Sequence, residues 1–113
     1  DKNHKCRKVI TCKHYLEEFF VKQWQKVKDK IIWTLSLVEY IERVPETYLQ
    51  NLQDDLYEIR VKLGQTSLGY FAFFDHDKLV VLAYGFQKKT QKTPKQKIEK
   101  ALKIKKEYED EKK

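Results

Sequence analysis

The hydrophobic period of the chain changes at Pro45, and this change constrains the fold more than any other feature. Before Pro45, apolar side chains recur every three or four residues, which predicts a long amphipathic helix from Trp24 to about Arg43, because the residue before a proline disfavours helix. Residues 56–63 alternate instead, which predicts a strand with one apolar and one charged face. The charged face carries Glu58, Arg60 and Lys62.

The remaining segments extend this pattern to an α+β fold. Short apolar runs predict strands at residues 7–11, 68–74 and 79–86, and helical spacing predicts a first helix from Lys13 that pairs with the long helix as a hairpin. Residues 45–55 form a polar connector with at most one helical turn. Thr93 and Gln96 around Pro94 predict a capped C-terminal helix, so the expected order is β-α-α-β-β-β-α.

The 113 residues predict one domain, 1–113, with fraying from about Glu107 to Lys113. No apolar run reaches the ~18 to 20 residues of a membrane helix, and no signal-peptide core follows the N-terminus, so we expect a cytoplasmic protein. Cys6 and Cys12 match no zinc spacing and the histidines are scattered, so we expect reduced thiols and neither metal nor cofactor.

Positive charge is concentrated at the two ends of the chain. The net charge is +7; residues 1–23 carry +3 and residues 87–113 carry +6, whereas residues 24–86 carry −2. Such an excess favours a polyanionic partner through long-range attraction and counterion release. On charge alone, a solvated lysine-rich helix explains it equally well.

A nuclease that cuts RNA without metal must bind the scissile phosphate, take the 2′-hydroxyl proton and neutralise the charge that develops. Strand cations and a basic loop after the last strand suit these tasks. Glu58 either orients Arg60 or acts as a base, and the alternative is a salt bridge at a sheet surface. The candidate catalytic residues are Arg60, Lys88, Lys89, Glu58 and Tyr84, and the candidate RNA-binding residues are Lys62, Gln87, Lys92 and Lys95.

Three segments together resemble the phage-derived HigB-like branch of the RelE/ParE toxin superfamily. They are Leu-Tyr-Glu-Ile-Arg at 56–60, Phe-Phe-Asp at 73–75, and Gly-Phe-Gln-Lys-Lys-Thr-Gln-Lys-Thr-Pro at 85–94. The resemblance implies a RelE-like fold, in which a helix hairpin and a C-terminal helix accompany a curved antiparallel sheet. It also implies a type II toxin, a metal-independent mRNA endoribonuclease on the ribosome, held inactive by a helix-turn-helix, HigA-like antitoxin.

The resemblance also implies roles for single residues. The strand arginine of the family corresponds to Arg60, its acidic neighbour to Glu58, and its basic loop to Lys88 and Lys89. Two positions depart from the family pattern. Gly69 stands where an arginine is usual, and Tyr84 where a histidine is common, which predicts weakened nuclease activity.

Two other functions fit the same fold. One is a ParE-like toxin that poisons DNA gyrase, and the other is a non-catalytic basic module that binds RNA or protein. The substitution Gly69→Arg discriminates among these functions, because RNA cleavage gained by the variant indicates a disabled nuclease.

Overall fold

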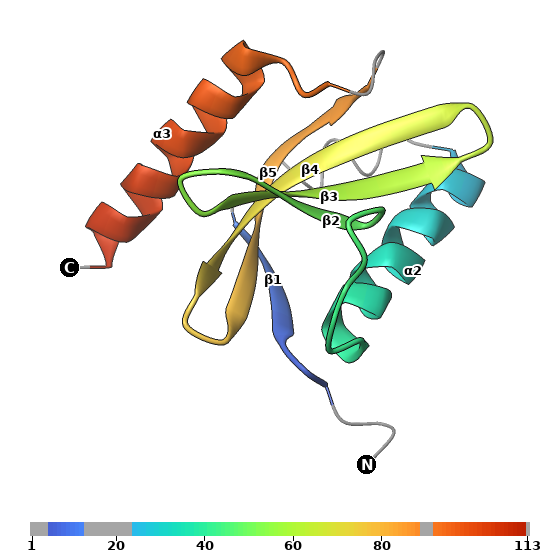
Figure 1. Ribbon diagram of the computed structural model, residues 1–113, viewed down its shortest axis with the longest axis horizontal. Coiled ribbons are helices and arrows are strands. Elements are labelled where there is room, and N and C mark those ends of the chain that lie inside the picture. The colour runs from blue at the N-terminus through green and yellow to red at the C-terminus, as the bar shows by residue number, and fades with distance from the viewer. Residues whose placement is uncertain (1–4, 13–23, 89–91, 113) are drawn as a thin grey trace.

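A computed structural model of the chain describes residues 5–12, 24–88 and 92–112. The first predicted helix falls in residues 13–23, outside the described residues. Its predicted pairing with the long helix as a hairpin therefore stays a prediction. The described part contains one five-stranded sheet and two helices (Figure 1). The elements are β1 (Lys8–Cys12), α2 (Gln25–Tyr40), β2 (Leu49–Gln53), β3 (Leu56–Leu63), β4 (Thr66–Asp75), β5 (Lys78–Gln87) and α3 (Lys95–Glu111). The fold is therefore α+β, as the sequence predicts.

The strands lie in the order β1-β5-β4-β3-β2. Neighbouring strands from β2 to β5 are antiparallel, and β1 pairs with β5 in parallel. The three strands predicted within 56–86 are thus confirmed as β3, β4 and β5. The prediction for residues 45–55 was wrong, because Leu49–Gln53 forms β2 at the edge of the sheet, with Gln50 opposite Glu58.

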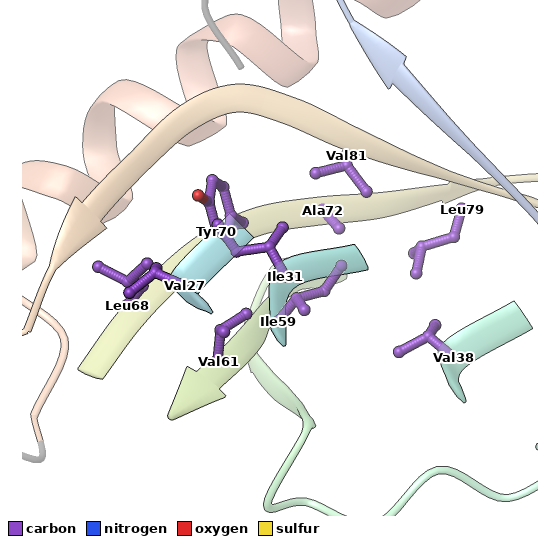
Figure 2. Packing of buried hydrophobic residues seen from close by; sticks show 10 residues of the cluster. All are labelled: Val27, Ile31, Val38, Ile59, Val61, Leu68, Tyr70, Ala72, Leu79 and Val81. Atoms are coloured by element: carbon purple, nitrogen blue, oxygen red, sulfur yellow. The ribbon is translucent and has the colours of Figure 1, made fainter. Parts of the chain in front are cut away.

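Each face of the sheet buries a separate apolar cluster. Figure 2 shows the cluster under α2, where Val27, Ile31 and Val38 pack on inward side chains of β3, β4 and β5. Tyr70 lies in this cluster, and burial raises the pKa of its phenol. The opposite face carries the cluster that α3 covers. Its members are Leu56, Phe71, Phe73, Val80, Leu82, Phe86 and Ala101.

The charged face of β3 is only partly covered: Glu58 is buried, Arg60 is half-buried and Lys62 is exposed. Ile59 and Val61 point toward α2, whereas Leu56 packs with the cluster under α3. Successive strand residues point to opposite faces, so Glu58 and Arg60 share the α3 side of the sheet. This placement puts the charged residues of β3 beside the chain that enters α3.

The N-terminal basic residue Arg7 has a structural partner. Its guanidinium donates hydrogen bonds to the carbonyl oxygens of Val38, Ile41 (2.8 Å) and Glu42 (2.7 Å) at the end of α2. Cationic side chains near a helix C-terminus satisfy its last carbonyls and interact favourably with the helix dipole. Arg7 therefore contributes to the positive charge of the N-terminal end and also fixes the start of β1 to the end of α2.

The start of α3 differs from the expected capping box. Pro94 is the N-cap residue, and among the described residues no side chain caps the helix by a hydrogen bond. The Thr93 hydroxyl instead lies 2.7 Å from a carboxylate oxygen of Glu58. The prediction that Thr93 caps this helix was wrong, because Pro94 occupies the N-cap position and the Thr93 side chain contacts the buried Glu58 carboxylate.

The end of α3 is held by the turn between β4 and β5. Fraying was expected from Glu107, whereas the helix continues to Glu111. The Tyr108 hydroxyl donates to Asp75 Oδ2 at 2.9 Å, and the Lys112 ammonium donates to the same oxygen. These contacts attach the far end of α3 to the sheet. Neither helix among the described residues has the length and apolar character to span a bilayer.

We expect Asp75 to stabilise the fold in a pH-dependent way. The hydrogen bond from Lys112, followed by that from Tyr108, lowers the pKa of Asp75. A carboxyl group whose pKa is lowered in the folded state contributes stability above its unfolded pKa and loses it as the pH falls through the folded pKa. Thermal melts should therefore show Asp75→Asn less stable than the native chain near neutral pH, with the difference closing in acid.

Asp77→Asn in the same turn is the matched control, since it removes an equal charge from an exposed residue. An Asp75→Asn variant that melts with the native chain at every pH would contradict the assignment.

Candidate RNA-binding site

The candidate site is built around Glu58, which is fully buried although it carries a carboxylate. Its Oε1 accepts hydrogen bonds from Arg60 Nε at 3.0 Å and from Lys88 Nζ at 2.8 Å. Its Oε2 accepts from the Thr93 hydroxyl at 2.7 Å. A buried charge needs this degree of pairing, because an unpaired carboxylate away from water is costly. Glu58 thereby connects β3, the end of β5 and the start of α3.

The structure thus brings together two of the candidate catalytic cations, Arg60 and Lys88. Arg60 comes from the middle of β3 and Lys88 from the residue after β5, whose backbone N–H donates to Ser67 O at 2.7 Å. The anion that they share in the structure is Glu58. The salt bridge between Glu58 and Arg60, which was the alternative to a catalytic role, is present, with the Arg60 side chain 28% exposed and the Glu58 side chain 0%. The second salt bridge, between Glu58 and Lys88, is interior, because the Lys88 side chain is 5% exposed.

Arg60 alone of this ion-paired trio has substantial access to solvent, with 28% of its side chain exposed. Within the described residues, only Nε of its guanidinium makes a hydrogen bond. The edge that carries Nη1 and Nη2 therefore remains available. Such an edge presents two parallel donors, which match two oxygens of one phosphate.

A shallow groove of about 240 Å³ adjoins this edge. It runs between β2 and the start of α3. Its lining residues are Gln50, Leu52, Gln53, Arg60, Lys92, Thr93 and Ile98. Arg60 and Lys92 line the groove and Lys88 shares the Glu58 carboxylate with Arg60, so cationic groups lie where an anionic ligand would enter.

The other predicted residues take different places. Lys92 lines the groove and is exposed, and Lys95 is exposed at the first position of α3. Lys62 and Gln87 are exposed at the ends of β3 and β5. Lys89 and the side chain of Tyr84 lie outside the described residues, so their roles remain predictions.

Three polar residues of the groove were not predicted from the sequence as site residues. Gln50 and Gln53 come from the strand that was predicted as a connector, and Thr93 was assigned to a helix cap. No local signal marks the two glutamines, because their position follows from the pairing of β2 with β3. Nowhere in the part of the chain that the structure describes do three His, Cys, Asp or Glu side chains gather as a metal site requires.

Gly69 lies at a crowded position of the sheet. It pairs with Arg60 across β3 and β4. A Cβ at this position would lie 3.1 Å from Glu58 Oε2 and 3.1 Å from the Phe86 ring. That ring is stacked on Phe71 at 5.3 Å and cannot retreat freely. The carboxylate of Glu58 and the ring of Phe86 thus occupy the space that the expected arginine would enter.

We expect Gly69→Ala to destabilise the fold by about 1 to 3 kcal/mol, as overpacking typically does. Urea denaturation measures this difference. The variant Gly69→Arg meets the same two groups, so it disturbs Glu58 as well as adding a cation. An unchanged free energy of unfolding for Gly69→Ala would show that the carboxylate and ring can yield without cost.

We expect Thr93→Val to cost about 1 to 3 kcal/mol, because it leaves a buried carboxylate oxygen without its donor while keeping the side-chain shape. Thr47→Val in the exposed connector is the matched control. Equal unfolding midpoints for the two variants in urea would contradict a stabilising role for the Thr93 hydroxyl.

The chain matches the family described as "Phage derived protein Gp49-like (DUF891)" over residues 18–106. This range includes Glu58, Arg60, Lys88 and Thr93. No curated protein and no solved structure matches the chain. The family match covers most of the sequence and includes the whole site, so the chain belongs to the Gp49-like family of phage-derived proteins, within the RelE/HigB-like toxin superfamily.

Proposed function

We propose that the chain is the toxin of a type II toxin–antitoxin pair and acts on messenger RNA through the groove beside Arg60. In the full form of this proposal it is a metal-independent endoribonuclease that cuts mRNA on the ribosome in the cytoplasm, and a helix-turn-helix antitoxin inhibits it. The family is toxin-like, which supports a toxin role. The positive charge of residues 87–113 supports a polyanionic target.

The single observation that carries the proposal is the state of Arg60. Glu58 engages its Nε, while Nη1 and Nη2 remain available beside a positive groove. The ion pair restricts the guanidinium to one orientation before a ligand arrives, and a preorganised group loses less entropy on binding. A phosphodiester contacting this edge would be held by two charge-assisted hydrogen bonds.

Within this proposal, Glu58 is a positioning residue and not the base. Both of its oxygens accept hydrogen bonds from protein groups, and its side chain is inaccessible to a ligand. Lys88 balances the charge of Glu58. Lys92 and Lys95 supply further attraction for the backbone of the RNA. Lys89 is assigned to the phosphate, and proton transfer from the 2′-hydroxyl then falls to Tyr84.

A second candidate function has its own support. Glu58 neutralises one of the cations expected at the phosphate, and the place of the expected strand arginine is filled by Glu58 and Phe86. An RNA-binding module that holds a transcript without cutting it requires neither the arginine nor a base. The two functions share the groove and differ in whether the phosphodiester bond breaks.

The substitution Arg60→Gln tests the shared part of both functions. It should weaken binding to single-stranded RNA about tenfold to a hundredfold, the loss expected for a charge-assisted contact worth ~1.5 to 3 kcal/mol. The slope of log affinity against log salt should fall by about 0.7, one phosphate contact on a single strand. Filter binding across a salt series measures both quantities.

Arg43→Gln, at an exposed arginine of the connector, is the matched control for lost charge. Thermal melts establish that each variant is folded. Equal losses in the two variants would show that Arg60 acts only through net charge. Toe-prints and transcript length in a translating extract then separate the two functions. Cleavage by the native chain supports the nuclease, whereas an intact transcript with retained RNA binding supports the binding module.

A further inference from the structure

The groove has a second wall, formed by β2, that faces the phosphate-binding edge. Gln50 lies opposite Glu58 in the pairing of β2 with β3, and Gln53 follows the irregularity in that pairing. Both line the groove with Arg60 and Lys92. Gln50 is half-buried and Gln53 exposed. The groove therefore carries neutral amides on one side and cations on the other.

A site for a phosphate alone would require only the cationic side of the groove, and not the amides of β2. A carboxamide presents one acceptor and two donors in a plane, which is the pattern that pairs with the polar edge of a nucleobase. Leu52 and Ile98 give the same groove apolar surface. A base has flat apolar faces and a polar rim, so it can pack on the aliphatic side chains and hydrogen-bond to the amides. A phosphate alone would leave the aliphatic side chains without a contact and would use only the N–H donors of the amides.

The size of the groove also restricts the ligand. At about 240 Å³ it is smaller than the ~300 to 1,000 Å³ pockets that enclose drug-sized molecules. It suits one nucleotide and not a duplex. Sequence-specific recognition of RNA usually depends on unpaired bases, whose edges are accessible to side-chain amides.

We propose that this groove binds one unpaired RNA nucleotide, with its phosphate on Arg60 and its base edge against Gln50 and Gln53. Strand β2 then determines which base is accepted. This inference rests on the proposed action on RNA and adds the determinant of specificity. The amide of Gln53 is only weakly engaged by Asp54 Oδ2, at 3.5 Å, so a base edge can replace that contact.

The experiment uses the full chain and a pool of short single-stranded RNAs with randomised sequence. Gln50→Met and Gln53→Met each remove an amide while keeping an unbranched side chain of similar length. Gln65→Met, in the exposed turn between β3 and β4, is the matched control. Bound and unbound RNAs are sequenced, total affinity is measured on the whole pool, and thermal melts verify folding of each variant.

The native chain and Gln65→Met should prefer one base at one position, by about fivefold to a hundredfold. Gln50→Met, Gln53→Met or both should flatten this preference, while affinity for the RNAs that carry a disfavoured base stays within about threefold, because the phosphate contact is kept. Arg60→Gln should lower binding to all sequences alike.

Three results overturn the inference. If the native chain binds RNA without base preference, or if both methionine variants retain the native preference, β2 does not determine specificity and the proposed function stands. If the native chain binds no RNA, free or in a translating extract, the proposed function fails, and the inference fails with it.

Discussion

The buried carboxylate of Glu58 is the interaction on which the site depends. Without it, Arg60 and Lys88 would repel each other, and the chain that leaves β5 would have no fixed point on β3. With it, two cations and one hydroxyl are oriented by a single group at distances of 2.7 to 3.0 Å. Removing one partner of such a buried network typically costs about 3 to 5 kcal/mol. The same contacts therefore stabilise the fold and set the direction of the Arg60 guanidinium.

Gly69 and Glu58 are best understood as a pair. A strand interior ordinarily disfavours glycine, which packs no side chain and loses more entropy on folding. Here the missing side chain makes room for Oε2 of Glu58 and for the Phe86 ring. Position 69 thus lacks the cation that the family resemblance implies, and the carboxylate that pairs with Arg60 and Lys88 lies beside the position of its Cβ. The expected consequence is a site that orients its ligand firmly but neutralises less of the charge that develops during cleavage.

Much of this arrangement could be predicted from the sequence, and the failures share a cause. Alternation in 56–63 identified the strand and placed Glu58 with Arg60, because side-chain direction in a strand is a local property. Residues 49–53 lack a clear alternation and become a strand only through pairing with β3. Thr93 matches the local signature of a helix cap, yet its hydroxyl donates a hydrogen bond to the Glu58 carboxylate, 35 residues away in the chain. Local patterns reveal local structure, whereas contacts across the sheet depend on the completed fold.

The unpredicted contacts are also the ones that give the groove its selectivity. Predicted cations form one wall and would attract any polyanion, since electrostatic attraction carries no sequence information. The other wall comes from the edge strand β2, which is positioned by its pairing with β3. Gln50 and Gln53 can change with little effect on the core, because the buried members of the apolar clusters lie in β3, β4, β5 and the helices, and β2 adds only the partly buried Leu49 and Leu52. The scaffold can therefore keep its ion-paired arginine while the acceptable base changes with the amides of β2.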